Sequence, residues 1–250
     1  APHPTREPSF TQTVPQSIRR ATAAARSRSA PQTLALSPYG ESLAAATAAS
    51  TSGTAATVTT GPHVSSQATV APGATERFAA DVADRGAAML DAPISGGEEG
   101  ARDATLSIMV GGERETFEAV HDVFEAMGET ITHTGGSGAG QVTKACNQIV
   151  VGCTHQAVAE ALLLAHRAGA DLEAVLDAIS GGAAACWSLS ERAPRVIEGN
   201  FEPGFFASYQ YKDLRIATAA GEEFGVPMPS TQVVHDMYKA MEEMGYGRDD

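Results

Sequence analysis

The chain has 250 residues, enough for one large domain or two ordinary ones with a real core. Its formal net charge of −13 is unevenly spread, since residues 1–75 carry +3 and residues 76–250 carry −16. An acidic body repels phosphate backbones and anionic membranes, so we expect neither a nucleic-acid partner nor a membrane partner.

Residues 1–68 do not have the composition of a folded domain. Ala, Ser, Thr, Pro and Arg dominate, and residues 1–75 contain only nine Ile, Leu, Val and Phe together. So little apolar surface does not offset the entropy lost on ordering a chain. The stretch 42–60 has neither a helical nor a strand period. The segment is typical of a disordered tail or, being rich in Arg and Ser and poor in acids, of an organelle transit peptide.

From Thr69 the pattern changes to alternating strands and helices. Helices are predicted over 72–85 and 113–127, and short apolar strands over 87–93, 105–110 and 131–134. Alternation of this kind is typical of the last part of an open α/β sheet.

After Gly140 the strand signals stop. A helix is predicted over 141–168, with apolar positions on more than one face, as expected of a helix buried between partners. Further helices are predicted over 171–179, 193–198, 210–224 and 230–244. Asp171 and Ser230 are the expected N-caps, and Gly225 with Pro227 marks a helix end. The sequence therefore predicts an α/β part joined to an all-α part near residue 138.

The three cysteines are Cys146, Cys153 and Cys186, an odd number without a C-x-x-C pair. This argues against a disulfide framework or a zinc site and favours a reducing cytosol. The histidines lack metal-ligand spacing, so no bound metal is expected. No apolar run approaches the length of a membrane span.

Lysine is scarce in this chain. Only Lys144, Lys212 and Lys239 occur, against 14 arginines. Many acids with few lysines is typical of a protein adapted to concentrated salt, because carboxylates hold hydration while salt screens their repulsion. We favour this halophilic interpretation over that of an ordinary acidic cytosolic enzyme.

The segment 138–148, GAGQVTKACNQ, has the first chemically suggestive pattern. On a helix beginning near Gly140, the side chains of Lys144, Asn147 and Gln148 share one face. The glycines allow a ligand or another backbone to come close. A lysine in the wall of a domain junction suits proton transfer, because desolvation lowers its pKa toward neutrality. A solvated surface lysine is the alternative for a lone Lys.

Two further segments are suggestive. The run 91–97, DAPISGG, places a hydroxyl and backbone N–H groups after a strand, where they can converge on an anion such as a carboxylate. Taken alone, Gly-Gly after a strand marks only a turn. The run 212–214, KDL, opens a helix and by itself indicates only a surface ion pair.

In this order the motifs resemble the β-hydroxyacid dehydrogenase family, which includes 3-hydroxyisobutyrate dehydrogenase and tartronate semialdehyde reductase. The resemblance covers residues 69–250 and rests on TVAPG, DAPISGG, HTGGSGAGQVTKACNQ, NFEPGF and YKDL at family-like spacing. It implies a Rossmann-type α/β domain over 69–137, its N-terminal part missing or aberrant. It also implies an all-α domain of the 6-phosphogluconate dehydrogenase type over 138–250, for substrate binding and dimerisation.

The resemblance also implies roles for single residues. Lys144 is the expected catalytic acid and base, and Asn147 a substrate ligand. The turn Ser95, Gly96 and Gly97 is expected to bind the substrate carboxylate. Thr69 is expected near the nicotinamide of NAD or NADP, and Lys212 close to the cofactor across the cleft.

One family feature is missing. The family opens with a G-x-G-x-x-G turn that places the pyrophosphate at a helix N-terminus, and no such motif occurs in this chain. The run 135–140, GGSGAG, lacks the third glycine at the required spacing. We interpret residues 1–68 as a mistranslated or frame-shifted stretch that replaces most of the nucleotide-binding half. Resequencing the gene tests this interpretation.

The sequence thus predicts an NAD(P)-dependent oxidoreductase acting on a small 3-hydroxy acid, with Lys144 moving the proton. A homo-oligomer is expected from the long helix and the all-α domain. The alternative is a catalytically dead remnant that retains only the all-α module for oligomerisation or acid binding.

Overall fold

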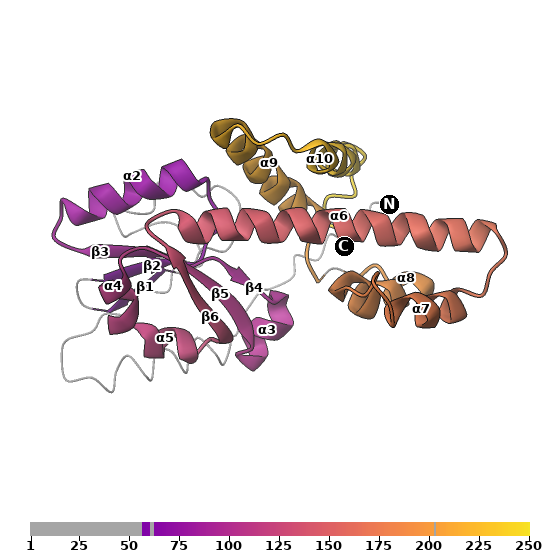
Figure 1. Ribbon diagram of the computed structural model, residues 1–250, viewed down its shortest axis with the longest axis horizontal. Helices are drawn as coiled ribbons and strands as arrows, with labels where there is room; N and C mark the ends of the chain where they lie inside the picture. Colours follow the sequence, from indigo (N-terminus) through magenta and orange to yellow (C-terminus); the bar gives the residue numbers. More distant parts are fainter. Residues whose placement is uncertain (1–56, 61–62, 203) are drawn as a thin grey trace, which may run out of the picture.

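The computed structural model describes residues 57–60, 63–202 and 204–250, and these form a sheet with flanking helices followed by helices alone (Figure 1). The strands are β1 (Thr57–Thr60), β2 (His63–Ser66), β3 (Ala88–Asp91), β4 (Ile94–Ser95), β5 (Leu106–Gly111) and β6 (Gly128–Gly135). The helices are α2 (Pro72–Ala83), α3 (Gly97–Asp103), α4 (Arg114–Ala119), α5 (His121–Glu125), α6 (Ala139–Arg167), α7 (Leu172–Ser180), the π-helix η1 (Ser188–Arg192), α8 (Ala193–Ile197), α9 (Ala207–Phe224) and α10 (Pro229–Glu243).

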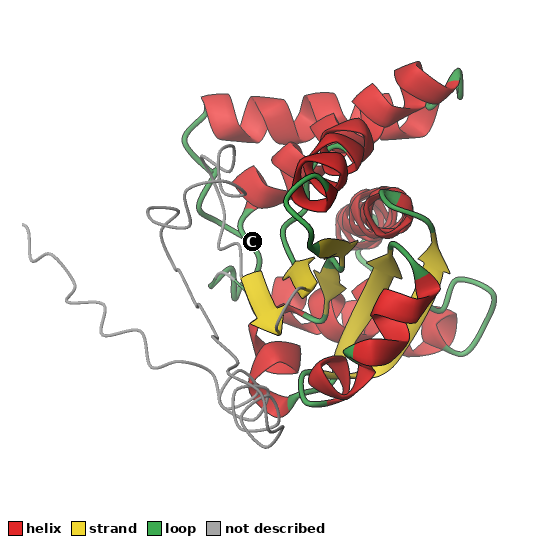
Figure 2. Cartoon of the chain, turned by 90° about the vertical axis from the view of Figure 1, so that its left-hand side faces the viewer, coloured by secondary structure: helices red, strands yellow, loops and turns green. Residues whose placement is uncertain are grey.

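The sheet has the strand order β1-β2-β3-β5-β4, and β6 pairs with β5. The pairs β2–β3 and β5–β6 are parallel, whereas β1 is antiparallel to β2 and β4 to β5. Helices α2 and α6 lie on one face of the sheet and α4 and α5 on the other (Figure 1 and Figure 2). The core between the sheet and α4–α5 is apolar, with Leu90, Ile108, Val110, Phe117 and Phe124 buried in it. The predicted α/β part is confirmed.

The sheet begins earlier than the boundary after residue 68 that the sequence suggested. Strand β1 lies inside the stretch 42–60, and β2 pairs in parallel with β3 through Val64 and Met89. The segments TVTT and HVSS are rich in β-branched residues, which favour strands. Their low hydrophobicity hid them, because small polar residues contribute little to an apolar period. The rest of the segment, residues 1–56, lies outside the described residues.

The prediction of one helix over 113–127 was wrong. The chain forms two short helices, α4 and α5, separated at Val120, whose φ of −124° and ψ of 13° are not helical. The bend keeps Phe117, Val120 and Phe124 in one buried cluster, so packing overrides the helical period. The sequence analysis also missed β4, which lies within DAPISGG, and α3, which begins at Gly97, the last residue of that run.

Helix α6 begins at Ala139, next to the join predicted near residue 138, and runs for 29 residues. Its first half packs on the sheet and on α9, and its second half on η1, α7 and α8. The sequence predicted a helix buried between partners; within the single chain, Val150, Leu163 and Leu164 are 61%, 58% and 72% exposed. By length and composition alone, α6 is long and apolar enough to cross a membrane, whereas the sequence analysis found no apolar run of that length. The core helix of a water-soluble protein meets the same criteria.

The all-α part confirms most of the predicted helix ends. Asp171 caps α7, accepting the backbone N–H groups of Glu173 and Ala174, and Gly225 ends α9 in the left-handed conformation with a φ of +68°. The prediction of Ser230 as an N-cap was wrong, because Met228 stands at the cap with Pro229 following it. Proline at the first helical position leaves no N–H to satisfy, so the start needs no polar cap.

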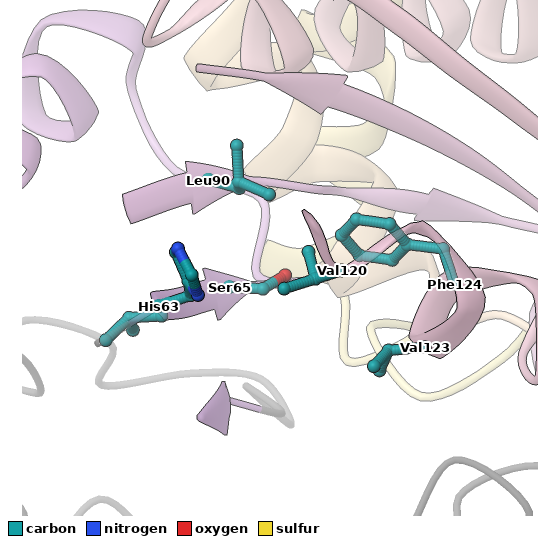
Figure 3. Close-up of a pocket in the computed structure, with 7 residues that line it drawn as sticks. His63, Ser65, Leu90, Val120, Val123 and Phe124 are labelled. Carbon is teal, nitrogen blue, oxygen red and sulfur yellow. The ribbon is translucent and has the colours of Figure 1, made fainter. Parts of the chain in front are cut away.

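A small hollow lies between β2, β3 and the α4–α5 pair (Figure 3). It is lined by His63, Val64, Ser65, Leu90, Val120, Val123 and Phe124. None of the residues singled out from the sequence lines it, and most of its wall is apolar. The hollow is therefore separate from the candidate site.

Candidate active site

The N-terminus of α6 is held by a carboxylate from the end of β3. Asp91 is 1% exposed, and its two carboxylate oxygens accept the backbone N–H groups of Gly138 at 2.8 Å and Gln141 at 2.9 Å. Burial raises the pKa of Asp91, and these backbone donors oppose the rise. A Cβ atom at Gly140 would lie 2.5 Å from the carbonyl oxygen of Met109. The glycine lets the helix begin directly on the sheet.

Lys144 lies three residues beyond Gln141 on α6 and is a buried cation. Only 6% of the residue is exposed, and its Nζ donates a hydrogen bond to Asn147 Oδ1 at 3.3 Å. The pKa of the Lys144 ammonium is lowered from 10.5 to about 8, mainly by burial; the Asp213 carboxylate opposes this shift and the Lys212 ammonium adds to it. An amine with a pKa in this range exchanges a proton in either direction, which suits general acid and base catalysis.

Polar side chains of α9 lie against the same part of α6. Gln148 Nε2 donates to Asp213 Oδ2 at 2.7 Å and to Gln210 Oε1 at 3.0 Å, and Gln210 Nε2 donates to the Gln148 carbonyl oxygen at 3.1 Å. All three side chains are buried. A Cβ atom at Gly152 would lie 3.0 Å from Gln210 Nε2. The network and the close approach fix α6 against α9.

Lys212 connects α9 to the segment that follows β2. Its Nζ lies 3.0 Å from Asp213 Oδ1 and 3.5 Å from the carbonyl oxygen of Thr69. The family resemblance implied that Thr69 and Lys212 both lie near the cofactor, and the structure brings these two residues together. The Asp213 carboxylate interacts with both lysines: it forms an ion pair with Lys212, and its negative charge raises the pKa of Lys144.

The Ser-Gly-Gly turn lies at the end of β4 and the start of α3. Ser95 is half-buried, whereas Gly96 and Gly97 are exposed and adopt φ values of +131° and +61° that favour glycine. Among the described contacts, no hydrogen bond joins this turn to Lys144. Their connection is indirect, since Asp91 stands four residues before Ser95 and holds the N-terminus of the helix that carries Lys144.

The structure therefore gathers Thr69, Lys144, Asn147 and Lys212 at the junction of the two parts. The sequence analysis missed two residues that hold the segments around this cluster, Gln141 and Gln210. Both are glutamines at buried positions of helices, 1% and 2% exposed. Helical spacing does not distinguish a buried glutamine from a solvated one, so the sequence carried no signal for them beyond their place beside KACN and KDL.

Two family profiles match the chain. One, described as the NAD binding domain of 6-phosphogluconate dehydrogenase, matches residues 11–136. The other, described as NAD-binding of NADP-dependent 3-hydroxyisobutyrate dehydrogenase, matches residues 138–250. The first match extends across most of the segment that the sequence analysis set apart as aberrant.

Curated relatives and solved structures are similar over most of the described chain. A 2-hydroxy-3-oxopropionate reductase of Escherichia coli is 42% identical over 178 residues, 71% of this chain and 61% of the relative. An uncharacterized oxidoreductase of Bacillus subtilis is 42% identical over 185 residues, 74% of this chain and 64% of the relative. The structure of a Mycobacterium tuberculosis 3-hydroxyisobutyrate dehydrogenase with L-serine superposes with a TM-score of 0.69 at 32% identity, covering 74% of this chain and 66% of that one.

These matches leave part of each relative uncovered. The chain spans 64% and 61% of the length of the two curated relatives. The solved structure is likewise covered only to 66%.

Proposed function

The chain belongs to the β-hydroxyacid dehydrogenase family, and from this premise we propose that it transfers hydride between NAD or NADP and the hydroxyl-bearing carbon of a small 3-hydroxy acid. Acids of the 3-hydroxyisobutyrate or 2-hydroxy-3-oxopropionate type are the proposed substrates, since relatives carry these names. The observation that carries the proposal is the buried Lys144 ammonium, whose pKa is lowered to about 8 at the junction of the two parts.

Lys144 is the proposed acid and base of the reaction. In the reductive direction its ammonium donates a proton to the oxygen that becomes the hydroxyl, and in the oxidative direction its neutral amine removes that proton. Asn147 is the proposed ligand of the same substrate oxygen, and its hydrogen bond from Lys144 Nζ supports this role. Ser95, Gly96 and Gly97 are the proposed ligands of the substrate carboxylate, through the Ser95 hydroxyl and exposed backbone N–H groups.

The residues present fit one end of the cofactor better than the other. Thr69 and Lys212 meet at the junction, next to Lys144, where a nicotinamide ring is required. The glycine fingerprint that cradles a pyrophosphate is absent from the sequence. When bound, the nicotinamide supplies or accepts the hydride. Lys144, Asn147 and the Ser95–Gly97 turn act only on the proton and on the position of the acid.

The missing fingerprint favours a second candidate function. Without a pyrophosphate cradle the chain is a remnant, in which the all-α part binds an acid or another subunit and no turnover occurs. The two candidates differ in cofactor binding, because the remnant has no means of holding a dinucleotide.

A spectrophotometric assay separates the candidates. Purified protein is mixed with NAD or NADP and 3-hydroxyisobutyrate, or with the reduced cofactors and 2-hydroxy-3-oxopropionate, and the nicotinamide absorbance is followed. We expect turnover by the wild-type chain and a loss of at least about a hundredfold in Lys144→Ala, since general acid–base catalysis contributes on that order. Lys239→Ala is the matched control, because the Lys239 side chain is 52% exposed and its ion pair with Glu243, at 3.9 Å, lies on the surface.

Calorimetric titration with NAD and NADP completes the comparison. Cofactor binding without turnover counts against the proposed substrates. Absence of binding establishes the remnant, and undiminished turnover in Lys144→Ala removes the lysine from its proposed role.

We also propose that the protein works as a homo-oligomer in a reducing cytosol. The second half of α6 exposes leucines, and large apolar side chains on α9 and α10 are exposed as well. Cys146, Cys153 and Cys186 are all free thiols, which suits a reducing compartment.

A further inference from the structure

The segment 68–70 crosses the first turn of α6, where one side chain holds it. Gln141 Nε2 donates to the carbonyl oxygen of Ala68 at 2.7 Å, and Gln141 Oε1 accepts the backbone N–H of Val70 at 2.9 Å. The side-chain amide therefore pairs with the backbone on both sides of Thr69, as a neighbouring strand would. Gln141 is 1% exposed, so its side-chain amide is shielded from water and depends on these two partners for its hydrogen bonds.

Gln141 is itself fixed in place. Its backbone N–H donates to Asp91 Oδ2 at 2.9 Å, and the other carboxylate oxygen of Asp91 holds Gly138 at 2.8 Å. The backbone of Gln141 is thus anchored to β3, and its side chain reaches the segment after β2. A glutamine held at both ends has little rotamer freedom left.

The segment held by Gln141 contributes to the proposed site. The Thr69 carbonyl oxygen lies 3.5 Å from Lys212 Nζ, and Lys144 follows Gln141 by three residues on the same helix. We propose that Gln141 is a positioning residue, whose side-chain amide holds Thr69 in register with Lys144 and Lys212. This inference rests on the proposed function for its catalytic meaning.

The pattern of donor and acceptor gives the inference a sharp test. An amide offers one donor to Ala68 and one acceptor to Val70, and a protonated carboxyl offers the same pair. An ionised carboxylate has acceptors only, so it repels the Ala68 carbonyl oxygen. Gln141→Glu therefore keeps both bonds of the clamp when its carboxyl is protonated; on ionisation it loses the bond to Ala68 and retains only an acceptor for the Val70 N–H. Gln141→Met has neither group and loses the clamp at every pH.

The rates are measured in the reductive direction, where Lys144 acts in its protonated form, and are divided by the wild-type rate at each pH. Gln141→Met is expected to lower kcat by about tenfold to a hundredfold, because small displacements of reacting groups have effects of that order. The Gln141→Glu rate is expected to recover toward wild type as the pH falls. Gln156→Glu is the control, since Gln156 lies on the same helix and its side chain donates to Glu160 at the surface.

A second readout does not depend on turnover. The chain contains three lysines, so competitive amine labelling with mass spectrometry follows each one separately. Release of the Thr69 segment is expected to raise the labelling rate of Lys212 relative to Lys239, whose side chain is 52% exposed. Gln141→Met is expected to raise this ratio at every pH, Gln141→Glu only when ionised, and Gln156→Glu not at all.

The two readouts separate the inference from the proposed function. If the wild-type chain is inactive but the labelling ratio rises in Gln141→Met, the clamp stands and the proposed function fails. If the wild-type chain is active, an unchanged ratio or an unchanged kcat in both Gln141 variants overturns the inference. If Gln141→Met does not fold, Gln141→Glu compared at low and neutral pH decides the question alone.

Discussion

Lys144 is the residue at which the demands of folding and of the proposed chemistry conflict. Burying an ammonium costs free energy, and this cost lowers the pKa of Lys144 to about 8. Asn147 supplies one hydrogen bond to Nζ, whereas the buried Asp213 carboxylate is already paired with Lys212. A lysine kept for stability would be expected to have an ion pair of its own, so the position of Lys144 favours a functional role.

Replacing Lys144 by Met is therefore expected to abolish turnover and to raise the free energy of unfolding at pH 7. The folded pKa of about 8 lies below the unfolded value of 10.5. Below pH 8 the Lys144 amine is protonated in both the folded and the unfolded state, so burying the charged ammonium costs its full free energy. Between the two pKa values only the unfolded state binds the proton, so wild-type stability rises with pH, and above 10.5 the cost is gone.

We expect Lys144→Met to be more stable than the wild type by on the order of 2 kcal/mol at pH 7, and the gain to shrink toward pH 10. Urea unfolding at pH 7 and at pH 10 measures the gain in the free energy of unfolding and its decrease with pH. Lys239→Met, an exposed control, is expected to change stability by less than about 0.5 kcal/mol at either pH. A net loss of stability in Lys144→Met at pH 7 would show that the lysine is structural.

The start of α6 is the element on which the site depends. Its first turn rests on the ends of β3 and β5, and Asp91 supplies the acceptors that the unpaired N–H groups of the helix require. A Cβ atom at Gly140 would lie 2.7 Å from both Asp91 O and Asp91 Oδ2. The sequence predicted that glycines here admit another backbone, and the structure identifies that backbone as the sheet.

Gly140→Ala is expected to destabilise the protein by more than about 2 kcal/mol, because the atoms it meets belong to rigid backbone or to a buried carboxylate. Gly136→Ala is the matched control in the same glycine-rich turn, since a Cβ there has no atom within 4 Å. The control is expected to change stability by no more than about 0.5 kcal/mol. Thermal unfolding followed by circular dichroism measures both variants, and equal effects would contradict this account.

At the scale of the whole molecule, α6 spans both parts and is covered on one side only along its second half. Helices α7 and α8 lie along one side of that half (Figure 1), and Leu164 is 72% exposed. Exposed leucines on a long helix favour burial against another copy of the chain. The net charge of −13 opposes association of two copies at low salt, and salt screens this repulsion. Adaptation to concentrated salt and self-association are therefore linked predictions.

Light scattering tests the oligomer directly. The wild-type chain is expected to have at least twice the monomer mass of 25.8 kDa. Leu164→Glu is expected to shift the protein to the monomer, because it places a charge in a dry contact. Glu118→Lys, on the exposed surface of α4, is expected to leave the mass unchanged. A monomeric wild-type chain would rule the oligomer out.

Much of this protein was determined by the sequence alone, because its signals are local. The ordered motifs indicated the family, and the periodicity of 141–168 placed Lys144, Asn147 and Gln148 on one side of a helix. Local signals also located Asp171 and Gly225 at helix ends. They failed where packing overrides propensity, as at Val120, and where a strand is short and polar, as at β1.

Only the tertiary structure decided how these residues act. Lys144 owes its lowered pKa to burial, Gly138 is held by Asp91 from 47 residues away, and Gln141 reaches Ala68 across 73 positions. Burial and hydrogen-bond pairing depend on which distant segments meet. Residue spacing predicts only which side chains are neighbours on the same helix or strand. The contacts that determine the chemistry of the junction join distant segments, so they follow only from the folded structure.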